Sequence, residues 1–198
     1  MSGELTFVGE QLWRRIGESM DRVERRLQRM IAILEAAGVP FAIVGGNAVR
    51  IWVAQVDPGA VRATNDIDVL IRSEDLDRVK RVMAEHGYQH RKAAGLDMFL
   101  ENQEDSARFA IHIVLANRQT KDSDFEANPD VEPAVMGEGI RTLPLEQLVR
   151  MKLNSYRLKD RVHLLDMIEV GLIDASWADR FPSPLSERLR SLIEHPDQ

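Results

Sequence analysis

Two features within residues 41–71 constrain this chain more than any other part of its sequence. The apolar run "FAIV" is followed at once by the pair Gly45–Gly46, and a second apolar run, "NDIDVLI", carries Asp66 and Asp68 one residue apart. Glycine weakens regular structure, and a carboxylate among Val, Leu and Ile is costly to bury without a partner. A cation shared with a phosphate group would compensate for both features.

In a β-strand, Asp66 and Asp68 would lie on the same face, because side chains alternate, and Ile67 and Val69 would lie on the other. The two aspartate Cα atoms would be about 6.5–7 Å apart, close enough for both carboxylates to hold one hard cation. Mg²⁺ suits such a pair because it takes its remaining ligands from water and substrate phosphates, and Mn²⁺ is the alternative.

The pair Gly45–Gly46 precedes a helix predicted over residues 47–56. Glycines allow a phosphate to approach the backbone closely, and a helix N-terminus offers unpaired N–H groups and a positive dipole end to an anion. Alone, each feature has an ordinary explanation: a solvated strand end for the aspartates and a turn for the glycines. In the order strand, glycines, helix, turn and strand, they indicate a site for a metal-bound phosphate.

The remaining pattern predicts an α/β (α+β) fold in which helices flank a small mixed β-sheet. The predicted strands are 41–44, 66–71, 88–92, 96–101 and 109–115, and a loop over 117–139 contains one short strand near residue 135. The predicted helices are 13–34, 47–56, 73–86 and 145–156, then 159–171 and 183–194, with Ser73 and Ser183 as caps. We expect an N-terminal helix packed on the core (1–38), an α/β core (39–143) and a C-terminal helical part (144–198).

The first helix carries an apolar stripe at steps of three and four residues. Its members are Trp13, Ile16, Met20, Val23, Leu27, Met30 and Leu34. Packing of this stripe on its own domain is the favoured interpretation, because only about three heptads are present. A homodimer seam is the alternative.

Composition narrows the class of protein. A length of 198 residues suits one domain with a helical extension, and the absence of cysteine excludes disulfides and thiolate metal sites. The sequence contains no apolar run near the roughly 20 residues of a membrane span and no basic leader ahead of an apolar segment. A net charge of −6 argues against a broadly basic nucleic-acid surface. We therefore expect a cytoplasmic protein without a membrane partner.

The motif from Gly45–Gly46 to "NDIDVL" resembles the glycine-pair and D-x-D signature of the nucleotidyltransferase superfamily, whose core is shared with DNA polymerase beta. Together with "KLNSYRLKD", it is similar to the small bacterial branch of AbiEii-type toxins and antibiotic-modifying nucleotidyltransferases. The resemblance covers about residues 41–168. It implies a small mixed sheet, binding of an NTP such as ATP with Mg²⁺, and transfer of the NMP group to an acceptor.

Carried over by position, the resemblance assigns roles to individual residues. Asp66 and Asp68 would be the metal ligands, whereas Asn47, with the two glycines, would hold the triphosphate. Lys152 would contact phosphates from the helix after the sheet. Thr64 is a further candidate phosphate contact, although it and the neighbouring Arg62 could equally serve only to enter the strand.

The sequence departs from the family pattern at two histidines. Relatives usually place a third carboxylate on a neighbouring strand, and the matching strand here offers His112. A neutral imidazole accepts a proton near neutral pH, so His112 is a candidate catalytic base, with a hydrogen-bonded core histidine as the alternative. His163 stands where relatives often carry an aspartate, and we interpret it as structural.

Three functions fit the sequence. The first is a Mg²⁺-dependent nucleotidyltransferase whose acceptor is a small molecule, a protein side chain or an RNA 3′ end, with a toxin–antitoxin role and a cognate partner protein among the options. The second keeps the fold but binds a nucleotide or protein without turnover. The third is a glycosyltransferase that uses its D-x-D pair to bind a nucleotide-sugar diphosphate, which the early glycine turn disfavours.

Overall fold

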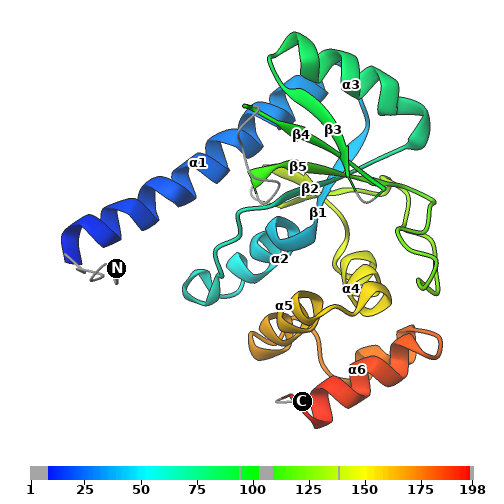
Figure 1. The fold of residues 1–198 in the computed structure, drawn as a ribbon. Helices are drawn as coiled ribbons and strands as arrows, with labels where there is room; N and C mark the ends of the chain where they lie inside the picture. The colour runs from blue at the N-terminus through cyan, green and yellow to red at the C-terminus, as the bar shows by residue number, and fades with distance from the viewer. Residues whose placement is uncertain (1–8, 94, 103–108, 138, 197–198) are drawn as a thin grey trace, which may run out of the picture.

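The structure of the chain is a computed structural model that describes residues 9–93, 95–102, 109–137 and 139–196. Its described helices are α1 (Gly9–Ala36), α2 (Gly45–Ala54), α3 (Leu76–Glu85), α4 (Leu145–Ser155), α5 (Leu158–Glu169) and α6 (Leu185–Glu194). Its described strands are β1 (Phe41–Val44), β2 (Ile67–Ile71), β3 (Gln89–Ala93), β4 (Leu96–Leu100), β5 (Ile111–Leu115), β6 (Val135–Gly137) and β7 (Ile140–Thr142). Short 3-10 turns lie at η1 (Pro58–Ala60), η2 (Ser73–Asp75) and η4 (Ala175–Arg180). Helices cover the sheet and continue beyond it at the C-terminal end, so the predicted α/β fold with a small mixed sheet is confirmed (Figure 1).

The seven described strands form one mixed sheet in the order β3-β4-β5-β2-β1-β7-β6. At its centre, β2 pairs antiparallel with β1 and parallel with β5. Asp68 is the register partner of Val44 on β1 and of His112 on β5. The pairing therefore brings the end of the first motif, the second aspartate and the candidate base into one row across the sheet.

Alternation along the strands separates the apolar core from the polar row. Ile67 and Val69 of β2 and Ile111 of β5 belong to one buried cluster with residues of α1 and α3. Asp68 and His112 fall between them in sequence, so their side chains lie on the opposite face, toward α4 and α5. The predicted placement of Asp68 on the face opposite Ile67 and Val69 is confirmed.

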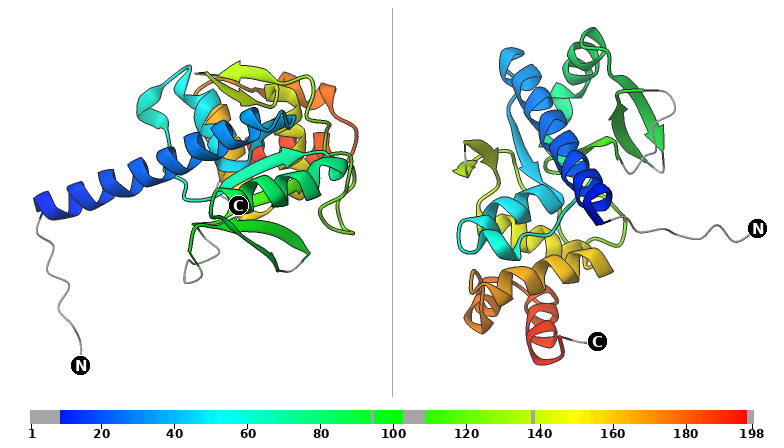
Figure 2. Two further views of the ribbon diagram at one scale, coloured as in Figure 1. Left: turned by 90° about the horizontal axis from the view of Figure 1, so that it is seen from above. Right: turned by 90° about the vertical axis from the view of Figure 1, so that its left-hand side faces the viewer.

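The second half of α1 packs against the sheet. Four members of its stripe are buried in the cluster with β1 and β2, namely Val23, Leu27, Met30 and Leu34. Met20 is 41% exposed, and the N-terminal end of α1 extends past the sheet (Figure 2). The side chains of Trp13 and Ile16 lie outside the described part of the structure. Contact with its own domain thus holds from Val23 onward, and the homodimer seam and the domain limits stay predictions.

A second core joins the C-terminal helices to α2. Val49 and Val53 of α2 are buried together with Leu148 and Leu153 of α4 and with residues of α5, η4 and α6. Because α2 follows β1 without a loop, it links the sheet to this helical layer. Among the described residues, none of the helices combines the length and the apolarity that a membrane span requires.

Several predicted element limits are wrong. Helix α2 begins at Gly45 rather than Asn47, and β2 begins at Ile67 rather than Asp66. The turn η2 occupies the residues ahead of α3, so Ser73 lies upstream of the helix start at Leu76 and makes no side-chain cap bond to it. The strand near residue 135 is one half of a hairpin with β7, whose three residues are too few to show a period of two.

Candidate active site

Both the backbone conformation at position 45 and the neighbouring side chain of Asp68 require a glycine there. Its φ of +67° lies in the left-handed region that glycine adopts without strain. A Cβ atom added at Gly45 would lie 1.9 Å from Oδ2 and 2.8 Å from Cβ of Asp68. The first glycine of the motif therefore leaves the space that the Asp68 side chain fills, which is a direct physical link between the two sequence features.

Gly46 has a different neighbourhood. A Cβ atom there would lie 2.9 Å from Oγ1 of Thr64 and 3.5 Å from Cε1 of His163. The second glycine thus allows α2 to start closely packed against the segment before β2 and against α5. Thr64 lies beside the N-terminus of α2, where its predicted phosphate contact stays a prediction.

Asn47 supports the first aspartate. Its side chain is 1% exposed, and its Nδ2 donates a hydrogen bond to the backbone carbonyl of Asp66 at 2.7 Å. This bond fixes the residue that precedes β2. The side-chain amide is therefore already used within the protein, and contact of Asn47 with a triphosphate stays a prediction.

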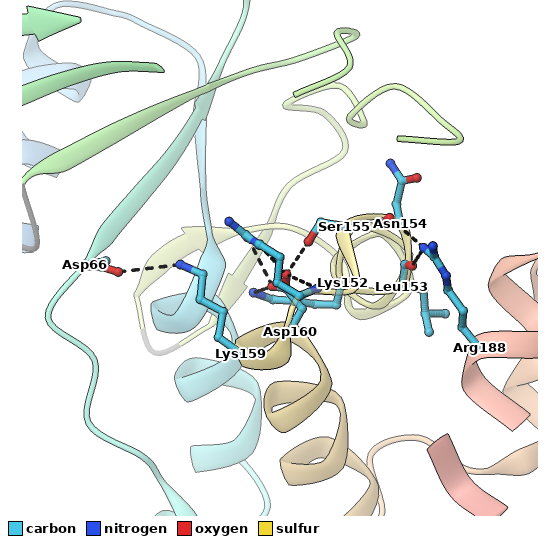
Figure 3. A network of polar contacts seen from close by, with 9 residues as sticks. Asp66, Lys152, Leu153, Asn154, Ser155, Lys159, Asp160 and Arg188 are labelled. Carbon is cyan, nitrogen blue, oxygen red and sulfur yellow. Dashed lines mark hydrogen bonds and ion pairs between the residues drawn. The ribbon is translucent and has the colours of Figure 1, made fainter. Parts of the chain in front are cut away.

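Asp66 and Asp68 are only partly exposed and face basic side chains. Nζ of Lys159 lies 3.8 Å from Oδ2 of Asp66, as Figure 3 shows, and Nδ1 of His112 lies 3.4 Å from Oδ1 of Asp68. Burial raises the pKa of Asp68, but the His112 ring and two nearby lysines together lower it by more than burial raises it. The pKa of Asp68 therefore lies below its ordinary value. Asp68 is therefore held as a carboxylate.

Lys152 lies in a buried polar network with Asp160, which Figure 3 shows between α4 and α5. Nζ of Lys152 lies 3.1 Å from Oδ1 of Asp160, and Nε of Arg157 donates to Oδ2 at 2.7 Å. The Ser155 hydroxyl also donates to this carboxylate. Burial raises the pKa of Asp160, but these partners lower it well below its usual range. For Lys152, burial lowers the pKa of the ammonium group, and the pairing with Asp160 only partly offsets this effect.

A turn separates α4 from α5, in agreement with the two helices predicted over 145–156 and 159–171. A single helix across Arg157 would place Lys152 and Lys159 on one face, but α4 ends at Ser155 and Tyr156 has a φ of 42°. The two lysines nevertheless converge on the aspartates from separate helices. Figure 3 shows Arg188 of α6 reaching this turn, where its Nη1 donates to the carbonyls of Leu153 at 2.6 Å and Asn154 at 2.8 Å.

Two other residues singled out from the sequence, Arg62 and His163, have structural roles. Nε of Arg62 donates to Oδ1 of Asp166 at 2.6 Å, so Arg62 anchors the segment before β2 to α5. Burial is the first cause that lowers the pKa of His163, to about 4. Its Nδ1 is buried without a hydrogen-bond partner in the described part of the chain. His163 is therefore a neutral side chain packed beside Gly46.

Two cavities meet at Asp68, and Asp66 lines the one beside α2. The cavity beside β5 measures about 180 Å³ and is lined by Gly45 and His112, among others. The cavity beside α2 measures about 290 Å³ and is lined by Gly46, Thr64 and His163, among others. Their walls share Asp68, Lys152, Arg157 and Lys159. The sequence interpretation did not include Arg157, although its place in "KLNSYRLKD", two residues before Lys159, was a signal for it.

The donor set fits a hard divalent cation. Within the described ranges, no group of three or more His, Cys, Asp or Glu side chains could hold a metal by itself. Two carboxylates open to a cavity suit Mg²⁺, because it binds through one or two carboxylates and completes its shell with water and phosphate oxygens. The space beside Gly45 that accommodates the Asp68 carboxylate supports the same fit.

The fold and this row of glycine, aspartates and histidine define a protein of nucleotidyltransferase-like architecture. The solution structure of the antibiotic-resistance factor ANT(2'')-Ia has a TM-score of 0.53 at 15% identity, covering 89% of this chain and 94% of that one. JHP933 from Helicobacter pylori has a TM-score of 0.50 at 19% identity, covering 91% of this chain and 76% of that one. At these identities the likeness concerns the fold alone.

The family follows from the sequence itself. Residues 11–152, more than half of the chain, match the family described as uncharacterised nucleotidyltransferase. The chain therefore belongs to this family of nucleotidyltransferases. No curated protein matches the chain.

Proposed function

We propose that the protein is a Mg²⁺-dependent enzyme that transfers the NMP group of an NTP to an acceptor and releases pyrophosphate. The observation that carries the proposal is the contact between Gly45 and Asp68 at the junction of two cavities. A carboxylate placed where only glycine leaves room for it, with a second carboxylate two residues away, suits a site that exists to hold a cation.

The residues around the aspartates divide the task. Asp66 and Asp68 would hold the metal, which when bound neutralises phosphate charge and polarises the reacting phosphoryl group. Gly46 lets the triphosphate approach the N-terminus of α2, where unpaired N–H groups favour an anion. Lys152 and Lys159 add positive charge from the helical layer and orient the phosphate chain for in-line attack.

His112 is the proposed base. Its ring lies beside Asp68 in the register of the sheet, where an acceptor hydroxyl must arrive. Asp68 orients the imidazole through Nδ1 and leaves the other ring nitrogen to receive the hydroxyl proton. This arrangement would replace the third carboxylate of other nucleotidyltransferases.

The test is pyrophosphate release from each NTP with Mg²⁺, combined with calorimetric titration of Mg²⁺–NTP. The double variant Asp66→Asn, Asp68→Asn should lose divalent-ion-dependent NTP binding and keep its fold, because the amides relieve like-charge repulsion at nearly constant volume. Unchanged Mg²⁺–NTP affinity in that variant would refute the site.

A non-catalytic nucleotide binder is the second candidate, and the absence of a third carboxylate beside Asp68 in the described structure favours it. Binding of Mg²⁺–NTP without turnover on a broad acceptor panel would select this alternative. A toxin–antitoxin role with a cognate partner protein belongs to the same proposal, because such a role depends on which acceptor the enzyme modifies.

A further inference from the structure

The inference that follows rests on the proposed function and names its acceptor. We propose that the cavity beside β5 binds the acceptor, and that this acceptor is a small hydroxyl compound with an apolar body and a negative charge. The two cavities meet at Asp68, but their walls differ.

The positions of His112 and Gly46 assign the two cavities. In-line displacement places the acceptor oxygen and the leaving pyrophosphate on opposite sides of the reacting phosphorus. Gly46 in the first turn of α2 lines the cavity beside α2 together with Asp66 and Thr64, which suits a metal-bound phosphate chain, whereas Gly45 lines the cavity beside β5. His112 lines only the other of these two cavities, so the acceptor hydroxyl belongs beside β5.

Much of the acceptor cavity wall is apolar. Leu96, Val114 and Met151 are partly buried and line it from β4, β5 and α4. A ligand that covers these side chains removes apolar surface from water, which favours a hydrocarbon or ring body. A volume of about 180 Å³ suits a small molecule or a single group rather than a folded partner.

The wall carboxylates other than Asp68 are already hydrogen-bonded within the protein. Oδ2 of Asp124 accepts the backbone N–H groups of Thr120 at 3.0 Å and Lys121 at 2.8 Å. Asp160 is held by Lys152 and Arg157. A polycationic acceptor would therefore find no free carboxylate on this wall once Asp68 holds the metal.

Lys121 supplies the complementary charge. It lines the cavity, its side chain is exposed, and it forms no ion pair within the described ranges. The wall as a whole carries four cationic side chains against three carboxylates, namely Lys121, Lys152, Arg157 and Lys159 against Asp68, Asp124 and Asp160. An anionic group on the acceptor can pair with Lys121 without displacing an internal partner, whereas a cationic group would be repelled.

Three hydroxyl compounds with the same phenyl body separate these cases: mandelate (anionic), phenylethanediol (neutral) and phenylglycinol (cationic). Each is titrated calorimetrically into the full chain saturated with Mg²⁺ and a non-hydrolysable NTP analogue. We expect mandelate to bind about tenfold more tightly than phenylglycinol, with phenylethanediol between them. Equal or tighter binding of phenylglycinol, or no binding of any of the three, would overturn the inference.

Two charge-reversal variants locate the effect. Lys121→Glu should weaken mandelate binding about fivefold or more and leave phenylethanediol binding unchanged. Arg118→Glu is the matched control, because Arg118 is exposed on the same loop but does not line the cavity, and it should change neither. An equal loss of mandelate affinity in both variants would show a long-range charge effect and overturn the assignment. Failure of the wild type to bind the Mg²⁺–NTP analogue would instead refute the proposed function.

Discussion

Replacing Gly45 with alanine tests the link between the glycine pair and the aspartates. The new Cβ would lie 1.9 Å from Oδ2 and 2.8 Å from Cβ of Asp68. Rotation of the Asp68 side chain can move the carboxylate away, but no rotamer moves its Cβ. The β1–β2 pairing must therefore shift where Val44 faces Asp68.

The expected cost has two parts. The φ of +67° costs an alanine about 1–2 kcal/mol. Overpacking of a tight contact adds about 1–3 kcal/mol. The two together destabilise the fold by about 2–5 kcal/mol. Because Asp68 is displaced, Mg²⁺–NTP affinity should fall about tenfold or more.

Gly87→Ala is the matched control. Gly87 has a φ of +87°, but a Cβ there meets nothing within 4 Å, so this variant carries the backbone strain without the clash. Urea denaturation of both variants, with calorimetric titration of Mg²⁺–NTP, separates the two parts. If Gly45→Ala is no less stable than Gly87→Ala and binds Mg²⁺–NTP normally, the steric argument is wrong.

Two further predictions concern histidines. His112→Ala should lower turnover by about a hundredfold or more with little change in NTP affinity, whereas His112→Asp should keep or raise activity; equal turnover of the alanine variant and wild type would make His112 a structural residue. His163 has a pKa of about 4 in the folded protein against about 6.5 when unfolded, so the unfolded chain binds the proton more readily. The stability of the wild type should therefore fall as the pH drops from about 6.5 toward 4. Thermal melts of His163→Gln should show a smaller fall in stability over that range. Identical pH profiles of the two proteins would count against a buried neutral histidine.

Local rules were enough to predict which face of its own strand carries Asp68 and which carries His112. Alternation in a strand fixes the faces of Asp68 and His112, and an apolar run after a helix stop locates β1. The parallel pairing that makes Asp68 and His112 register partners depends on which strands meet, which periodicity does not encode. Their proximity was therefore implied by family resemblance rather than by the pattern of the residues.

The contacts from the helical layer could not be predicted in the same way. Arg62 and Asp166 are separated by 104 positions in the chain. The approach of Lys159 to Asp66 depends on the left-handed backbone at Tyr156, a conformation that glycine or asparagine usually marks. A tyrosine there gives no signal of left-handed backbone, so the sequence predicted two helices but not the direction that the second takes toward Asp66.

The charged side chains of the candidate site come from two layers, the sheet and the C-terminal helices, and this affects how the protein loses function on heating. Asp68 and His112 lie on strands of the sheet, and Asp66 directly precedes β2. Lys152 and Lys159 lie on helices that share a separate core with α2. Neither core alone supports all the charged side chains of the site. Partial melting of the helical layer would therefore remove the two lysines, to which we assign phosphate binding, while the sheet stays folded. Heat or mild denaturant should abolish nucleotide binding before most of the β-structure is lost, and a cofactor that bridges both layers would delay this step.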